Sequence, residues 1–139
     1  MFEDNDISAL DNFRNAIRSG NRDEQFEKAK ELFTSNSYRD ALFSYEILQK
    51  MYPNDNGFCN FKIAECYLNL DEEEKAIDFF VDAYEVGYNK DLCDDAIWDA
   101  SERACYKFRE IDFIHRYSQK LPNGKYVRKS KEIIENFRK

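Results

Sequence analysis

Residues 38–83 read YRDALFSYEILQKMYPNDNGFCNFKIAECYLNLDEEEKAIDFFVDA. In this stretch a pattern of small and aromatic residues occurs once and then begins again. An alanine is followed by an aromatic residue four positions on and by a third residue eight positions further, and the set recurs after 35 residues. Recurrence at this period is typical of helical repeat proteins. The two sets are Ala41, Tyr45 and Pro53, then Ala76, Phe80 and Tyr88; matched residues lie upstream at Ala29, Leu32 and Tyr38, then Ala64, Tyr67 and Glu73.

Apolar spacing predicts that each repeat is a pair of helices. Within residues 38–52 the apolar residues follow one another at steps of 3, 1, 3, 3 and 4, in phase with 3.6 residues per turn. Pro53 ends this helix, because proline is excluded from helix interiors and disfavours helical geometry in the residue before it. The stripe consists of Tyr38, Ala41, Leu42, Tyr45, Leu48 and Tyr52.

The same patterns divide the whole chain into five segments. Residues 1–21 hold an amphipathic helix from about Asp6 to Arg18, with Ile7 in its stripe, which could cover the open end of a stack, pair with a second copy or stay mobile. Residues 22–56 and 57–90 form the first and second repeats, residues 91–122 a degenerate third, and residues 123–139 a capping helix.

Two local features are expected from capping chemistry and helical periodicity. Asp71 is expected to cap the second helix of the second repeat, with Glu74 in capping-box spacing and the acidic run 71–74 favoured by the helix dipole. In the last helix one face is expected to point inward and the Lys and Arg residues outward. The inward residues are Tyr126, Ser130, Ile133, Ile134 and Phe137; the outward ones include Lys125, Arg128, Lys129 and Lys131.

Composition restricts the class of protein and partner. With 42% hydrophobic and 16% aromatic residues but only four Gly and two Pro, the 139 residues are expected to form one all-α domain. A net charge of -7 disfavours nucleic acid and anionic membranes, which reward clustered Lys and Arg. The chain opens without a basic, then apolar, leader and has no stretch of membrane-spanning length. We therefore expect a cytoplasmic protein whose partner is a basic or amphipathic polypeptide.

Residues capable of chemistry are few and scattered. The four cysteines lack the paired short spacings of zinc or redox motifs and are expected to be buried thiols at helix contacts. His115 is the only histidine, is interpreted as a surface residue, and has no phosphate-binding loop beside it. The acidic group at Asp94, Asp95, Asp99 and Glu102 is interpreted as solvated helix charge, with a cation site as the rarer alternative. No catalytic residue, metal or cofactor is predicted.

These residues resemble the tetratricopeptide repeat family across residues 22–122, strongly in the first two repeats and weakly in the third. The resemblance implies a right-handed α-solenoid of stacked antiparallel helix pairs with capping helices at its ends. Two departures occur near the start of the first helices, where the large residue usual in the family is Gln25 or Asn60, with Phe26 and Phe61 one place later.

In this family the first helices line a concave groove that binds other polypeptides. The alternative is that the aromatic residues in these positions are covered by the N-terminal helix and complete the core. Carried over to this sequence, the groove positions that we select as the partner-binding site are Phe26, Lys30, Phe33, Phe58, Phe61, Glu65, Leu68, Asn69, Asp95, Asp99, Glu102 and Arg103; the same frame also includes Asp23, Thr34 and Leu92.

The resemblance implies a non-enzymatic interaction module or small chaperone. The clamp with which some members hold a C-terminal carboxylate is not reproduced, since its places include Phe26, Glu65 and Asp95. The aromatic first helices are also similar to those of the family's secretion chaperones, some of which pair through an N-terminal helix, so a homodimer is possible. The alternative function is a cognate inhibitor, an immunity protein or antitoxin, whose acidic surface blocks a basic toxin.

Overall fold

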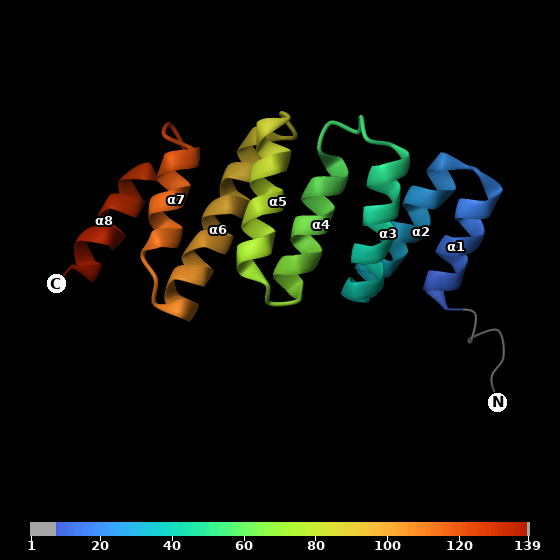
Figure 1. The fold of residues 1–139 in the computed structure, drawn as a ribbon, viewed down its shortest axis with the longest axis horizontal. Helices are drawn as coiled ribbons and strands as arrows, with labels where there is room; N and C mark the ends of the chain where they lie inside the picture. Colours follow the sequence, from blue (N-terminus) through green and yellow to red (C-terminus); the bar gives the residue numbers. More distant parts are fainter. Residues whose placement is uncertain (1–7, 139) are drawn as a thin grey trace. The chain divides into compact units, whose positions relative to one another are not determined.

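The computed structural model describes residues 8–138, and the regular secondary structure of this part of the chain is entirely helical (Figure 1). The all-α class expected from the sequence is confirmed. The chain divides into two compact units, one ending at Asp55 and the other starting at Asn56. The first unit contains α1 (Ala9–Ser19), α2 (Arg22–Thr34) and α3 (Tyr38–Met51); the second contains α4 (Phe58–Asn69), α5 (Glu73–Glu85), α6 (Lys90–Phe108), α7 (Asp112–Lys120) and α8 (Val127–Phe137).

In the first unit, helix α1 packs against α2, with Phe13 and Ala16 buried. Gln25 of α2 is fully buried beside them. Its amide nitrogen donates to the Ala16 carbonyl over 3.1 Å, and its amide oxygen accepts from the Tyr52 hydroxyl over 2.6 Å. A buried amide is tolerated when its polar atoms are paired, so Gln25 can occupy this buried position. The expected start of α1 near Asp6, and Ile7 of its stripe, lie outside the described residues.

The turns that end α2 and α4 share one geometry. Asn36 and Asp71, 35 residues apart, have left-handed φ angles of 66° and 63°. In each turn the next residue donates back into the helix, from the Ser37 N–H to the Leu32 carbonyl and from the Glu72 N–H to the Tyr67 carbonyl, both over 2.9 Å. These are the hydrogen bonds of a Schellman motif. Asp71 therefore terminates α4; the prediction that it caps α5 was wrong, because the residue preceding α5 is Glu72.

Substitution at Asn36 tests the left-handed turn. Asn36→Val is expected to lower the free energy of unfolding by about 1–2 kcal/mol, since a β-branched side chain is strained at positive φ, whereas Asn36→Gly should leave it within about 0.5 kcal/mol. Urea denaturation measures both. Thr34→Val places the same side chain at an exposed helical position nearby and is the control. Equal stability of the three variants would contradict the assigned turn.

In the second unit each helix packs against the next one in the chain, and small residues lie at the contacts. Ala64 of α4, Ala76 of α5 and Ala100 of α6 are fully buried. All four cysteines are thiols buried on α4 and α6, which confirms the expectation for them. Burial raises the pKa of the Cys93 thiol to about 11. The core is completed mainly by Phe61, Phe80, Ile97, Trp98, Phe113, Ile114, Tyr117, Leu121 and Ile133.

The acidic run 71–74 has a structural role beyond its effect on the helix dipole. Glu73, at the start of α5, is only 3% exposed. Its carboxylate is 2.9 Å from the Lys107 ammonium and 3.8 Å from the Arg103 guanidinium, both on α6. Lys107 also donates to the Asp71 carbonyl over 3.0 Å. The run thus links the end of α6 to the turn between α4 and α5.

A buried hydrogen-bond network joins α6, α7 and the loop before α8. The buried Asp94 carboxylate accepts from the Tyr117 hydroxyl and, over 2.9 Å, from the Lys125 N–H. The Tyr117 oxygen in turn accepts from the Tyr126 N–H over 3.0 Å. Burial, and then the hydrogen bond to Asp94, raise the pKa of Tyr117 well above its usual value. The expectation that Asp94 is solvated helix charge was therefore wrong.

The final helix buries less of its apolar face than its sequence suggested. Ser130 and Ile133 are buried and Ile134 is partly buried, but Phe137 is 41% exposed. Its ring packs against that of Tyr106, itself 56% exposed, with centroids 6.0 Å apart. Ile134 and Phe137 lie near the end of α8, which explains why the expected inward face holds only in its first part.

Candidate partner-binding groove

An open groove of about 250 Å³ lies between α4 and α6 in the second unit. Phe61, Phe80 and Ala96 supply apolar surface at its base, and Leu92, 41% exposed, supplies an apolar side chain at its edge. Three carboxylates complete the lining. We call this site the α4/α6 groove; its residues are Phe61, Glu65, Leu68, Asn69, Phe80, Leu92, Asp95, Ala96 and Asp99.

The rim carboxylates differ in how firmly they are held. Glu65 pairs with Lys62 over 2.9 Å, one turn away on α4. Asp95 accepts from the Tyr126 hydroxyl over 2.6 Å and lies 2.7 Å from the Lys125 ammonium. The hydrogen bond from Lys125, and to a smaller extent the one from Tyr126, holds the pKa of Asp95 below its usual value.

Asp99 is the rim carboxylate most available to a ligand. Its side chain is 61% exposed, and its contact with the Arg103 guanidinium is long, at 4.0 Å. Arg103 is drawn toward Asp71 and Glu73 as well, each 3.8 Å away. A cationic group entering the groove therefore meets Asp99 with little competition, since an exposed pair at this distance contributes little energy.

Six of the predicted site residues line this groove, but the aromatic one is not exposed. Phe61 is only 5% exposed; its ring lies 5.1 Å from that of Phe80 and 5.2 Å from that of Tyr88. It forms part of the base because Phe80 of α5 and Tyr88 of the segment between α5 and α6 pack against its ring. The six residues are Phe61, Glu65, Leu68, Asn69, Asp95 and Asp99.

The other predicted site residues lie elsewhere. Phe58 packs edge to face against Tyr88 with centroids 6.1 Å apart, and Glu102 and Arg103 of α6 do not line the groove. The remaining three belong to α2 of the first unit: Phe26 packs on Tyr52, Phe33 packs edge to face on Tyr38, and Lys30 is exposed.

Sequence reasoning left Phe80 and Ala96 out of the groove. Phe80 belongs to the repeat pattern, and it packs in the core of the second unit while also lining the groove. Ala96 follows Asp95 on α6 and is partly buried. The small size of Ala96 is the signal that could have identified it, because a small side chain between two longer ones leaves a hollow.

Other features that could carry a function are limited in the described part of the chain. Within residues 8–138 no group of three or more His, Cys, Asp or Glu side chains is arranged to hold a metal ion. His115 is partly buried on α7. None of the helices described has both the length and the apolar character needed to cross a bilayer.

The pKa of Asp95 predicts a pH-dependent stability. A carboxyl whose pKa is lowered by folding stabilises the native state above its unfolded pKa of about 3.9 and loses that effect as the pH falls through the folded value. Asp95→Asn is therefore expected to lower the free energy of unfolding at pH 7. The difference from the parent protein should become smaller as the pH falls below about 4. Urea denaturation at pH 7 and pH 3 measures the difference.

Asp99→Asn is the matched control for this measurement, since it removes the same charge from a more exposed position on α6. Its cost at pH 7 should be smaller than that of Asp95→Asn. An Asp95→Asn effect that is as large at pH 3 as at pH 7 would show that Lys125 and Tyr126 do not stabilise the ionised carboxylate.

No protein-family model matches the chain, and neither a curated protein nor a solved structure is significantly similar to it. Its function has to be inferred from the geometry described above.

Proposed function

We propose that this protein is a non-enzymatic interaction module of the tetratricopeptide repeat type that binds a basic or amphipathic segment of another polypeptide in the α4/α6 groove. Three helix pairs, α2 with α3, α4 with α5 and α6 with α7, correspond to the repeats, and α1 and α8 to the capping helices. In this proposal the pairs form a right-handed solenoid whose first helices line the inner face.

The observation that carries the proposal is the composition of the α4/α6 groove. An apolar base and the exposed Leu92 suit an aliphatic or aromatic side chain, while Glu65, Asp95 and Asp99 suit Lys or Arg beside it. A polypeptide that alternates these two types would fit such a groove. The excess of acidic over basic residues, 28 against 21, favours the same class of partner by long-range attraction.

A cognate inhibitor is the second candidate, favoured by the same acidic rim. An immunity protein or antitoxin would use these carboxylates to cover a basic toxin site. The identity of the partner separates the two candidates: a chaperone should retain an unfolded or extended secreted protein, and an inhibitor should retain a folded toxin such as a nuclease and abolish its activity. In either case the protein is expected to act in the cytoplasm and without a cofactor.

The test is co-purification from the native host followed by reconstitution with the purified partner. Leu92→Asp combined with Asp99→Lys removes the exposed apolar contact and reverses the most available charge, and should weaken binding at least about tenfold. Val86→Asp is the control, because Val86 is 59% exposed and lies outside the groove. Retention of the partner by the groove variant, or equal loss in both variants, would overturn the proposal.

A further inference from the structure

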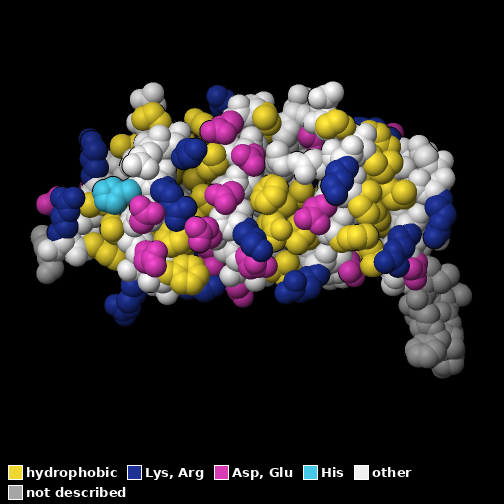
Figure 2. Space-filling model, viewed as in Figure 1, with side chains coloured by type: hydrophobic (Ala, Val, Ile, Leu, Met, Phe, Trp, Pro, Cys, Tyr) yellow, Lys and Arg dark blue, Asp and Glu magenta, His cyan; other side chains and the backbone are white. Residues whose placement is uncertain are grey.

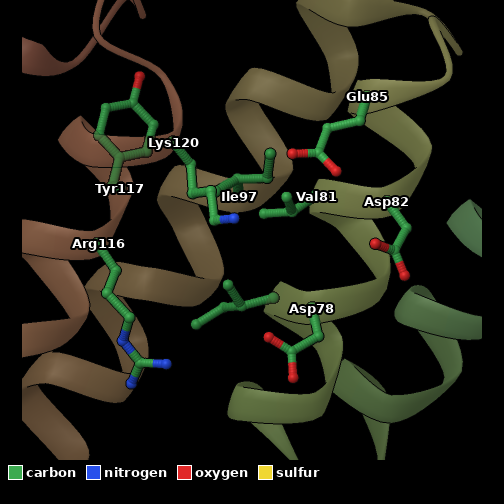
Figure 3. Close-up of a pocket in the computed structure, with 9 residues that line it drawn as sticks. Asp78, Val81, Asp82, Glu85, Ile97, Arg116, Tyr117 and Lys120 are labelled. Atoms are coloured by element: carbon green, nitrogen blue, oxygen red, sulfur yellow. The ribbon is translucent and has the colours of Figure 1, made fainter.

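A second pocket, of about 200 Å³, lies on α5, α6 and α7 (Figure 3). It shares no lining residue with the α4/α6 groove. Its floor is apolar: Ile77 and Val81 of α5 are 7% exposed, and Ile97 of α6 is fully buried. We call it the α5/α7 pocket; the remaining lining residues are Asp78, Asp82, Glu85, Arg116, Tyr117 and Lys120.

One wall of this pocket is acidic. Asp78, Asp82 and Glu85 are spaced by four and three residues along α5 and so lie on one helix face. Figure 3 shows the carboxylates of Asp78 and Glu85 directed toward the gap between α5 and α7. Figure 2 shows acidic side chains over α5 beside basic side chains over α7. The pocket therefore has charged walls above an apolar floor.

The acidic wall lacks cationic partners. Among the residues that the structure describes, none forms an ion pair or a side-chain hydrogen bond with Asp78, Asp82 or Glu85. Arg116, across the pocket, lies 3.1 Å from Asp112 and 3.5 Å from Glu74. Three carboxylates therefore face a single uncommitted cation, Lys120.

The pKa of Asp82 reflects this imbalance. Burial raises it first, followed by the negative charges of Glu85 and Asp78, and Lys120 only partly opposes the rise. Ionised Asp82 is thus less favourable in the folded protein than in water. A positive charge placed beside these carboxylates would relieve their mutual repulsion.

We propose that the α5/α7 pocket receives an arginine side chain from a partner polypeptide. The guanidinium would lie against Asp78, Asp82 and Glu85, and its aliphatic stem would cover the apolar floor. Arginine is preferred over lysine because its planar fork can pair with two carboxylates at once. The volume suits one side chain and is below the roughly 300–1,000 Å³ of small-molecule sites.

Removing the charge of Lys120 should affect arginine binding in the opposite direction to removing the carboxylates. Its side chain extends across the pocket toward the floor (Figure 3). An incoming guanidinium is repelled by this ammonium and must displace it. Removing the charge with Lys120→Gln should therefore tighten binding, whereas removing carboxylates with Asp82→Asn and Glu85→Gln should weaken it.

The experiment is an NMR titration of the ¹⁵N-labelled protein with N-acetyl-L-arginine amide. Amide shifts are expected to concentrate on residues 77–86 and around Ile97 and Lys120. The Asp82→Asn, Glu85→Gln variant should bind on the order of fivefold more weakly, and Lys120→Gln on the order of twofold more tightly, as expected for partly exposed charges. N-acetyl-L-glutamine amide, without the charge, should cause no saturable shift at these residues.

A matched charge control completes the design. Asp95→Asn combined with Asp99→Asn removes two carboxylates from the α4/α6 groove and should leave binding in the α5/α7 pocket unchanged. Equal weakening by both double variants, or shifts spread evenly over other acidic surfaces, would show that arginine binds by net charge alone and would overturn the proposal. Circular dichroism confirms that each variant is folded before titration. Failure here would leave the α4/α6 groove proposal intact, because the two sites share no residue.

Discussion

Replacing Ala76 with glutamate is expected to lower the free energy of unfolding by about 3–5 kcal/mol, because it buries an unpaired charge. Ala76 is fully buried on α5 in the core of the second unit, where α5 packs against both α4 and α6. The new side chain must either displace the neighbouring helix or remain uncharged and unsatisfied. Urea denaturation followed by the fluorescence of Trp98, the single tryptophan and a core residue of the same unit, measures the loss.

Lys75→Glu is the control for Ala76→Glu. It introduces the same side chain one residue earlier, where the lysine is 62% exposed, pairs with Glu72 over 3.3 Å and lies 5.5 Å from the centroid of the Tyr67 ring. Its cost should stay below about 1 kcal/mol, as for other exposed ion pairs. If both variants unfold at the same urea concentration, the packing face assigned to α5 is wrong. The repeat pattern predicts a similar loss for Ala41→Glu in the first unit, where Ala41 is also fully buried.

Asp94→Ala is expected to destabilise the protein by about 2–4 kcal/mol, since it leaves a buried hydroxyl and a backbone N–H without an acceptor. The two orphaned donors are those of Tyr117 and Lys125. Asp94→Asn keeps an acceptor oxygen and should cost less. Asp91→Ala is the matched control, because the Asp91 side chain is 79% exposed and pairs with the Lys125 ammonium at the surface.

A double-mutant cycle shows whether the hydrogen bond itself accounts for the loss. Tyr117→Phe and Asp94→Ala together should cost less than the sum of the two single changes, because both break the same contact. Additive costs would mean that Asp94 acts through something other than Tyr117. The free energies of unfolding should be measured by urea denaturation with the Trp98 fluorescence signal. This signal reports on the second unit in all four proteins.

A related constraint exists at Gly124, which lies against the hydroxyl end of the Tyr117 side chain. A Cβ atom there would approach the Tyr117 hydroxyl and would lie 2.9 Å from the ring carbon that carries it. Such a distance is far below van der Waals contact, so any side chain at this position must displace the ring. The loop before α8 is therefore fixed both by hydrogen bonds and by shape.

The helical elements were predictable because their signals are local and repeated. Alanine and aromatic residues at 35-residue spacing identified the contacts at Ala41 and Ala76, and both are buried. The division into two compact units was not predictable in the same way. It depends on how many contacts cross the chain near Asp55, which periodicity within single helices does not report.

The sequence was misleading where one residue type serves two structural purposes. Asp71 fits an N-cap, but aspartate also tolerates the left-handed conformation that ends a helix, and the structure uses the second property. Asp94 lies among other acidic residues on α6, so its burial could be recognised only once Tyr117 and Lys125, 23 and 31 residues away, were placed beside it.

Part of the α4/α6 groove was among the residues that the family frame selected. The frame took residues from α2, α4 and α6, and those that line this groove, such as Leu68 and Asp99, come from α4 and α6. The frame could not show that Phe61 is covered by Phe80 and Tyr88, because that depends on how α5 and the segment after it pack against α4. The carboxylates of the α5/α7 pocket lay outside the frame entirely.

The positions of the four cysteine thiols make them an internal reporter of local unfolding. All four thiols belong to the unit that starts at Asn56, and each is shielded from solvent. A thiol-reactive dye therefore labels the native protein only when the packing around a thiol opens, since a buried, protonated thiol is a poor nucleophile. Labelling kinetics set against the loss of total helicity therefore tell whether α4 and α6, which carry the thiols, open before the rest of the protein melts.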